Sequence, residues 1–351
     1  MFANRLKKRQ RHLKKWAKRT GTGAFRLYDR DIPEIPLVLD LYGDIVSGAL
    51  YKRPYEKDEA EETVWLEEMQ AAAAQALGIG RENIIIKRRE RQRLIEGAKF
   101  QYGKISGEGR GGPSVLSTVS EGGLKFKVNL SDYLDTGLFL DRRALRGAVR
   151  SGSAGKRVLN LFCYTASFSV YAAAGGAVST DSVDLSNTYL NWAKENFALN
   201  GFKITSEKLG MRNEERGGGS CHRLIKADVK EFLRRAAAAG LQWDIIILDP
   251  PAFSNSSMAS TDFDLRRDYG DLLLACLALL APAGKLIFSA GARSFKITAA
   301  DIEIFLAEYF SGITVSDQSG KFVDEDFRGK KVPRTFFITN GGLRRSAAGG
   351  M

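Results

Sequence analysis

A run of branched apolar residues leads straight into two prolines at Asp244-Ile245-Ile246-Ile247-Leu248-Asp249-Pro250-Pro251-Ala252-Phe253. Such a run is typical of a strand that is buried on both faces of a parallel sheet. The prolines end the strand, because they lack the N–H group that a sheet ladder needs. They leave the Asp249 carboxylate and the preceding carbonyl groups to accept hydrogen bonds, and Phe253 offers a face for a planar base. We therefore expect Asp249, Pro250 and Phe253 to form a site for a planar substrate; the alternative is a structural turn.

Strands and helices alternate on both sides of this segment. The expected strands cover 157–162, 177–183, 221–226, 243–248 and 285–290, and the expected helices cover 167–174, 187–200, 229–238, 262–280 and 298–310. This alternation predicts an α/β fold with a doubly wound, mostly parallel sheet that binds ligands at the carboxyl ends of its strands. Residues 314–318 and 335–339 are expected to add an antiparallel edge, and the whole domain to cover 131–345.

Residues 25–130 predict a smaller α+β domain. A hairpin is expected over 37–51, a helix over 57–77 that stops at Gly78, and further strands at 83–87, 114–119 and 124–129. A dense basic patch follows at 87–93, and a Gly-rich loop at 103–112. The patch is either a second contact for a polyanion or an ordinary solvated rim.

The net charge of +12 is concentrated in residues 1–24, which contain nine cations and no acid and leave only +3 for the rest of the chain. Phe2, Leu6, Leu13 and Trp16 recur at helical spacing, so we expect a basic amphipathic N-terminal helix. A local excess of cations favours a nucleic-acid partner. The alternatives are a solvated tail and an organelle-targeting peptide, although targeting peptides are usually richer in Ser.

Composition excludes several classes of protein. Three scattered cysteines, Cys163, Cys221 and Cys276, form neither a disulfide framework nor a zinc knuckle. The chain has two histidines, too few for a His-centred metal site or a Ser-His-Asp relay, so we expect no metal. No run approaches the ~18 apolar residues of a membrane span, and no signal peptide is evident. We expect a cytoplasmic protein with no membrane partner.

The loop Cys163-Tyr164-Thr165-Ala166-Ser167 follows the first strand of the larger domain. It lacks the GxGxxG fingerprint, and the chain lacks a GxxxxGK[ST] loop, which argues against dinucleotide and nucleoside triphosphate sites. The N–H groups at the start of the next helix suit a carboxylate. Asp184 and Asp228 end the next two strands, where they could accept hydrogen bonds from a ribose and an adenine amino group or simply cap helices.

Several longer segments carry a resemblance to a known family: Asn4-Arg5-Leu6, Tyr28-Asp29, and residues 132–141, 159–165, 188–190 and 249–256. They resemble class I S-adenosylmethionine-dependent methyltransferases that act on ribosomal RNA, and most of all the RlmK-like enzymes that form the C-terminal half of the fused bacterial RlmKL. The resemblance implies a Rossmann-like fold and S-adenosylmethionine as cofactor. It also implies 23S rRNA or a large-subunit assembly intermediate as partner, and 7-methylguanine as product.

The resemblance also implies roles for individual residues. Asp184 would hold the ribose, Asp228 the adenine amino group, and the Thr165 loop the methionine end of the cofactor. A Leu-Asp-x-Arg pattern falls on Asp141 and Arg143, where Arg143 would pair with the cofactor carboxylate. The full set of expected cofactor-binding residues is Asp141, Arg143, Asn160, Phe162, Tyr164, Thr165, Asp184, Asp228, Val229 and Asp249.

The sequence departs from that family in two places. Ala166 stands where the family usually has Gly, which costs about 1 kcal/mol if the position needs a positive φ. In the fused relatives a THUMP-containing methyltransferase module precedes the part that resembles this chain; we expect RNA capture here by residues before 131 or by a separate THUMP-type partner.

Methylation at guanine N7 needs no general base, because N7 carries a lone pair and no proton, and the scarcity of His agrees with this. Cytosine-C5 methylation is the nearest alternative, but it needs a nucleophilic Cys, and the segment Ser289-Ala290-Gly291-Ala292-Arg293 has none. Methylation of an exocyclic amine or of a protein glutamine would also suit the Pro-Pro-aromatic turn. A non-catalytic RNA-binding assembly factor is a further alternative, suggested by Ala166.

Overall fold

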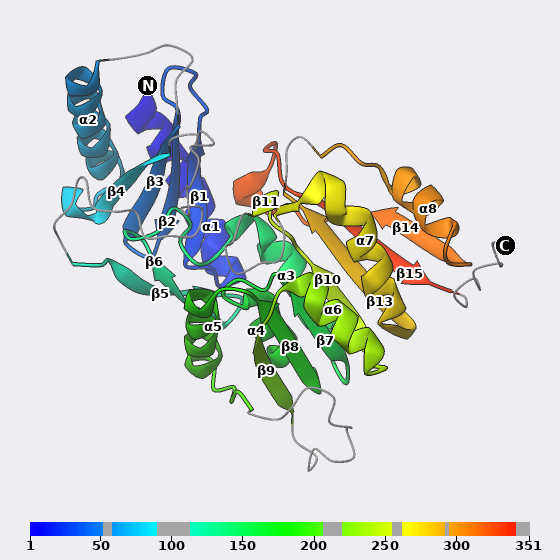
Figure 1. Ribbon diagram of the computed structural model, residues 1–351. Coiled ribbons are helices and arrows are strands. Elements are labelled where there is room, and N and C mark those ends of the chain that lie inside the picture. The colour runs from blue at the N-terminus through cyan, green and yellow to red at the C-terminus, as the bar shows by residue number, and fades with distance from the viewer. Residues whose placement is uncertain (52–57, 90–112, 206–219, 255–261, 292–294, 342–351) are drawn as a thin grey trace. The chain divides into compact units, whose positions relative to one another are not determined.

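The computed structural model describes residues 1–51, 58–89, 113–205, 220–254, 262–291 and 295–341. The chain divides into two compact units, residues 1–140 with 324–328 and residues 141–323 with 329–351 (Figure 1). Parts of the basic patch at 87–93, the Gly-rich loop and the segment 292–293 lie outside the described residues.

The second unit is built on a seven-stranded sheet of order β14-β15-β13-β10-β7-β8-β9 (Figure 1). Its strands are β7 (Arg157–Leu161), β8 (Ser179–Asp184), β9 (Cys221–Lys226), β10 (Trp243–Leu248), β13 (Leu280–Ala290), β14 (Ile313–Asp317) and β15 (Arg334–Asn340). Only β15 runs opposite to the other strands of this sheet. The expected doubly wound, mostly parallel sheet with an antiparallel edge is therefore confirmed.

Helices cover both faces of this sheet. They are α3 (Arg143–Gly152), α4 (Ser167–Ala174), α5 (Asn187–Leu199), α6 (Val229–Ala238), α7 (Leu265–Ala278) and α8 (Ala299–Ala307). Alternate strand residues enter two cores, as Ile245 and Ile247 pack with α3 and α4 while Ile246 and Leu248 pack with α6 and α7. Burial on both faces explains why the strands read as continuous apolar runs.

Two elements of this unit differ most from expectation in where they begin. Strand β13 begins at Leu280 rather than at 285. Helix α7 begins at Leu265 rather than at 262, because the short strands β11 (Phe253–Ser254) and β12 (Phe263–Asp264) pair with each other just before it. Asp264 then caps α7 by accepting a hydrogen bond from the Arg266 N–H at 2.8 Å.

The first unit is α+β, as expected. It contains α1 (Phe2–Thr20), α2 (Glu59–Leu77), the sheet β1 (Ala24–Asp29), β2 (Leu37–Tyr42), β3 (Ile45–Tyr51) and β4 (Ile84–Arg89), and the hairpin β5 (Leu116–Glu121) and β6 (Leu124–Asn129). The β2–β3 hairpin is confirmed, and so is the stop of α2 at Gly78, whose φ is 69°. The prediction did not include β1.

Residues 131–140 belong to the first unit, whereas the sequence placed them in the larger domain. Hydrogen bonds explain their position. Lys87 donates its ammonium to the Tyr133 carbonyl at 2.5 Å, the hydroxyls of Tyr42 and Thr136 lie 2.7 Å apart, and the Asn129 N–H donates to the Thr136 carbonyl at 3.0 Å. Lys87, expected in an exposed basic patch, is buried.

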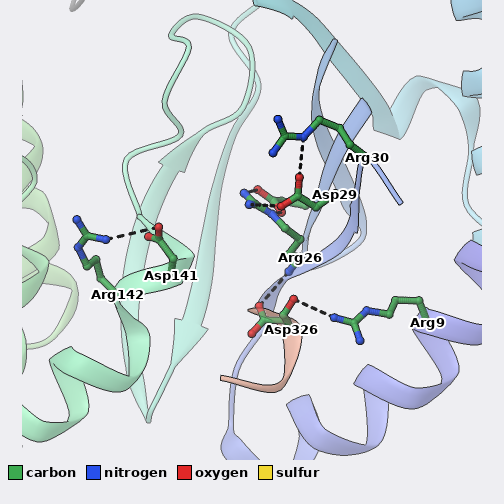
Figure 2. A network of polar contacts seen from close by, with 8 residues as sticks. Arg9, Arg26, Asp29, Arg30, Asp141, Arg142 and Asp326 are labelled. Carbon is green, nitrogen blue, oxygen red and sulfur yellow. Dashed lines mark hydrogen bonds and ion pairs between the residues drawn. The ribbon is translucent and has the colours of Figure 1, made fainter. Parts of the chain in front are cut away.

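A short piece of the C-terminal chain completes the first unit. The Asp326 carboxylate accepts the Arg26 backbone N–H at 3.0 Å, and its carbonyl accepts the Arg9 guanidinium at 2.9 Å (Figure 2). The Arg26 guanidinium lies 4.8 Å from the centre of the Phe327 ring and donates to Asp40 at 2.8 Å. Asp326 is completely buried, where a polar side chain needs hydrogen-bond donors such as the Arg26 N–H.

Helix α1 is amphipathic, as expected. Phe2, Leu6, Leu13 and Trp16 are buried in a core shared with β1 and α2, and the Phe2 ring meets Tyr28 edge-on with ring centres 5.2 Å apart.

None of the helices that the structure describes is both long enough and apolar enough to cross a membrane.

Candidate cofactor and substrate site

The expected site residues of the second unit gather at one edge of its sheet. Strands β9, β8, β7 and β10 are neighbours and run parallel, so their carboxyl ends meet along that edge. Asp184 is the last residue of β8, and the loops that begin at this edge contain Phe162, Asp228 and Asp249. Ligands of open α/β sheets bind at this position.

The loop after β7 has an unusual backbone. Phe162, Tyr164 and Ala166 have φ values of 54°, 54° and 58°, and the residues between them do not have a positive φ. Three N–H groups of this loop already have acceptors: Cys163 donates to the Val183 carbonyl at 3.0 Å, Tyr164 to Asp184 Oδ2 at 2.9 Å and Ala166 to the Cys163 carbonyl at 2.8 Å. A backbone that alternates in the sign of φ can form a concave anion-binding surface only from the N–H groups that remain. A positive φ is costly for residues with a Cβ atom, and Ala166 does adopt the left-handed conformation at which a Gly would be less strained.

Side chains from neighbouring elements support this loop. The Asn196 amide donates to the Thr165 carbonyl at 2.9 Å, and the ring centres of Tyr164 and Tyr189 lie 4.5 Å apart. Asn160 of β7 is buried and donates to the Ser169 hydroxyl of α4 at 2.9 Å. Asn160 therefore helps to fix the start of α4, a role that the sequence did not indicate.

Asp184 connects two loops at this edge. One carboxylate oxygen accepts the Tyr164 N–H and the other accepts the Ser186 N–H, both at 2.9 Å. Burial raises the pKa of Asp184 to about 6, although these backbone hydrogen bonds act in the opposite direction. The carboxylate is thus held in one orientation, and each oxygen has a further lone pair for a ligand hydroxyl.

Asp228 caps helix α6, which is the purely structural role that the sequence left open beside binding of an adenine amino group. One of its carboxylate oxygens accepts the Glu231 N–H at 3.1 Å. Val229, the first residue of α6, is 4% exposed and belongs to the core. Thr165 and Arg143 are buried as well, with 0% and 7% exposure.

Asp249 is held by a residue that the sequence analysis missed. Arg142 donates from Nε to Asp249 Oδ2 at 2.9 Å and from Nη2 to Oδ1 at 2.8 Å. Arg142 also pairs with Asp141 at 3.5 Å, as Figure 2 shows. Burial acts to lower the pKa of Arg142, but the two carboxylates outweigh it and raise this pKa. The guanidinium therefore stays charged.

The pair of Arg142 and Asp249 has no signal in the sequence beyond the position of Arg142 between Asp141 and Arg143. Its partners are 107 residues apart. The carboxyl end of β13 lies beside it, since a Cβ built on Gly291 would be 3.5 Å from Arg142 Nη2. Ser289, near the carboxyl end of β13, is buried, and its hydroxyl has no hydrogen-bond partner among the described residues.

The proline turn after β10 presents one aromatic side chain. Pro250 is buried, whereas Phe253 is half-buried in β11, which pairs with β12. The rings of Phe162 and Phe263 lie 5.3 Å apart, so the loop after β7 and strand β12 share an aromatic contact. Asn255 and Ser256, which carried part of the resemblance, lie outside the described residues.

All three cysteines are buried. Burial raises the pKa of the Cys163 thiol well above its ordinary value, with the Asp184 charge adding to the effect, and burial alone raises that of Cys276. A thiol with a raised pKa is a poor nucleophile at neutral pH. His222 is also ruled out as a ready base, since burial lowers its pKa to about 4.

A family model described as S-adenosylmethionine-dependent methyltransferase matches residues 29–297. The fold is also that of a methyltransferase whose crystal structure is complexed with SAH, at 26% identity and a TM-score of 0.69 over 96% of this chain and 80% of that one. Fold and site thus define an S-adenosylmethionine-dependent methyltransferase with a Rossmann-like sheet, and S-adenosylmethionine is its cofactor.

Two curated relatives narrow the class. Ribosomal RNA large subunit methyltransferase K of Neisseria meningitidis is 44% identical over 337 residues, which cover 96% of this chain and 86% of that protein. The K/L methyltransferase of Pseudomonas paraeruginosa is 44% identical over 340 residues, which cover 97% of this chain but only 42% of that protein. The chain belongs to the family of ribosomal RNA large subunit methyltransferase K.

Proposed function

We propose that this chain transfers the methyl group of S-adenosylmethionine to N7 of a guanine in 23S rRNA. The observation that carries the proposal is the proline turn after β10, where Arg142 fixes Asp249 beside the half-buried Phe253. The names of the Neisseria and Pseudomonas relatives support large-subunit rRNA as the substrate.

The residues at the sheet edge fit the cofactor. The N–H groups at the start of α4, directly after the loop that follows β7, would hold its carboxylate, and Asp184 presents oriented acceptors for its ribose. Asp228 keeps one oxygen beyond its helix cap, which can accept from the adenine amino group. When bound, the cofactor supplies a methyl group on a positively charged sulfur.

The chain's own residues position the guanine. The Phe253 ring stacks on the base, and Asp249 with the carbonyl groups of the turn accepts hydrogen bonds from its N–H edge. Because Arg142 already neutralises the Asp249 charge, the carboxylate can bind neutral N–H donors without attracting a stray cation. So placed, the guanine N7 lone pair would accept the methyl group that the bound cofactor supplies, with the N–C bond forming as the bond of that group to sulfur breaks. No proton moves, so alignment and exclusion of water provide the catalysis.

A substrate that lacks N7 tests this assignment. We expect the purified chain to methylate transcribed 23S rRNA, and to lose that activity on a transcript in which every guanine is 7-deazaguanine. The replacement puts a carbon atom in place of N7 and keeps the pairing edge. Methylation of the 7-deaza transcript at an undiminished rate would show that an exocyclic amine or a cytosine is the acceptor.

The cytosine-C5 alternative is disfavoured by the buried thiols of Cys163, Cys221 and Cys276. The non-catalytic alternative has one observation in its favour, the strained φ of Ala166 in the cofactor loop. Calorimetric binding of S-adenosylhomocysteine separates it from the enzyme, because a factor that has lost the cofactor site gives no heat of binding.

The share of the Pseudomonas relative that aligns, 42%, supports the further proposal that this chain corresponds to the K half of a K/L protein. Under this proposal it works on rRNA in the cytoplasm, and a separate THUMP-type protein contributes to RNA capture.

A further inference from the structure

The cations of helix α1 divide into two groups. Three of its basic residues hold the helix in place: Arg5 pairs with Asp31 at 3.2 Å, Arg9 donates to the Asp326 carbonyl at 2.9 Å, and the His12 ring lies 2.8 Å from Glu325. The others are exposed and make no ion pair among the described residues. These form the cation ridge, which consists of Lys7, Lys8, Arg11, Lys14, Lys15, Lys18 and Arg19.

The cation ridge has a regular geometry. Lys7, Arg11, Lys14 and Lys18 follow one another by four, three and four residues, so they share one face of the helix. Successive members rise by about 4.5–6 Å along the axis. Lys8, Lys15 and Arg19 form a second line beside the first. The buried apolar line of Phe2, Leu6, Leu13 and Trp16 lies on the other side of the helix.

The arrangement is unfavourable for the isolated helix. Lys7 and Arg11, Lys14 and Lys18, and Lys15 and Arg19 are like-charge pairs four residues apart, which destabilise a helix. The helix contains no acidic residue that could compensate them. Burial of the apolar line outweighs this repulsion, and a polyanion placed on the ridge would remove it.

We propose that the cation ridge binds the phosphate backbone of the substrate RNA, with the line of Lys7, Arg11, Lys14 and Lys18 making separate phosphate contacts. This inference rests on the proposed function in taking RNA as the polyanion. An anionic membrane is the less suitable partner, because the apolar side chains that would enter a lipid surface are buried in the core of the first unit. The ridge reads no bases and provides affinity without sequence preference.

The test compares three forms of the full chain. The ridge variant carries Lys7→Gln, Arg11→Gln, Lys14→Gln and Lys18→Gln, and Gln matches Lys and Arg in helix propensity. The matched control variant removes the same charge from exposed cations of the second unit, Lys156→Gln, Lys194→Gln, Lys203→Gln and Arg235→Gln. Fluorescence anisotropy measures binding to a labelled fragment of 23S rRNA at several salt concentrations.

The salt dependence of RNA binding gives the size of the expected difference between wild type and the ridge variant. Each phosphate contact contributes about 0.7–0.9 to the slope of log affinity against log salt, so four lost contacts reduce the slope by roughly 3. Between 50 and 200 mM salt, wild type should therefore lose roughly 50- to 150-fold more affinity than the ridge variant. The control should keep the wild-type slope, and all three forms should bind S-adenosylhomocysteine equally. The ridge variant should unfold at no lower temperature than wild type, because it loses like-charge pairs of α1.

Other results overturn the proposal. Equal slopes for wild type and the ridge variant would remove α1 from the RNA interface, and an equal loss in the control would reduce the effect to net charge. If the ridge variant loses binding only to vesicles of phosphatidylcholine and phosphatidylserine, the partner is a membrane. If wild type binds S-adenosylhomocysteine but no rRNA fragment, the proposed substrate itself is wrong.

Discussion

Replacement of Arg142 by Ala should separate positioning of the substrate from stability of the fold. The change removes both hydrogen bonds to Asp249, at 2.9 and 2.8 Å, and leaves a carboxylate whose side chain is only 16% exposed. Loss of one partner from a buried ion pair costs about 3–5 kcal/mol. Because both side chains of this pair keep some exposure, we expect a loss near the lower end, about 3 kcal/mol in the free energy of unfolding.

Catalysis should suffer more than cofactor binding. Without Arg142 the Asp249 carboxylate can turn away from the guanine, and a displacement of about 1 Å lowers the rate of an aligned transfer by roughly 100-fold. Asp184 accepts hydrogen bonds from backbone N–H groups, whereas Arg142 pairs with Asp141 and Asp249, so we expect the affinity for S-adenosylhomocysteine to change little. Single-turnover methylation, calorimetric binding and urea unfolding measure the three effects separately.

Arg157 provides the matched control. It donates to Asp244 through two contacts of 3.2 Å at the other end of β10. Arg157→Ala should lose stability, by less than Arg142→Ala because its pair is more exposed, and should keep its turnover. Arg142→Lys should recover part of the activity, since it restores the charge without the two-pronged geometry. Equal turnover in Arg142→Ala and Arg157→Ala would refute the positioning role.

Three further predictions follow from named residues. The affinity for S-adenosylmethionine should fall as the pH drops through about 6, because protonation of Asp184 removes a hydrogen-bond acceptor, and it should be constant well above that pH. Calorimetry between pH 5 and 8 measures this affinity, and a flat profile would show that Asp184 does not bind the ribose. Ala166→Gly should relieve the φ of 58° and stabilise the protein by up to about 1 kcal/mol in urea unfolding, with tighter cofactor binding; a destabilised variant would contradict the strain. Leu13→Ala, at a side chain with 0% exposure, should destabilise the first unit by about 2–5 kcal/mol, whereas an unchanged unfolding curve would show that α1 is not packed on its core.

Local patterns predicted the larger sheet well. Strands β9 and β10 and helices α4 and α6 begin and end at the expected residues. Their sequences change from apolar runs to helical periodicity at sharp boundaries, and these boundaries are short-range information. Strand β1 was missed because Arg26 interrupts its apolar residues, and the reason for that Arg is its partner Asp40 on β2.

Long-range contacts account for what the sequence could not show. The membership of residues 324–328 in the first unit depends on Arg9 and Arg26, about three hundred positions earlier in the chain. The role of Arg142 depends in the same way on Asp249. For Asp228 the local signal in the sequence has two meanings, because an Asp at a strand end can serve as a helix cap or as a ligand acceptor.

The central claim is methylation of guanine N7 in 23S rRNA, and nucleoside mass spectrometry of 23S rRNA tests it most directly. The comparison uses cells with the gene, cells without it, and cells complemented by wild type, Arg142→Ala or Asp249→Ala. We predict that 7-methylguanosine is lost without the gene, returns with wild type, and does not return fully with either variant. An unchanged level of 7-methylguanosine in cells without the gene would contradict the claim.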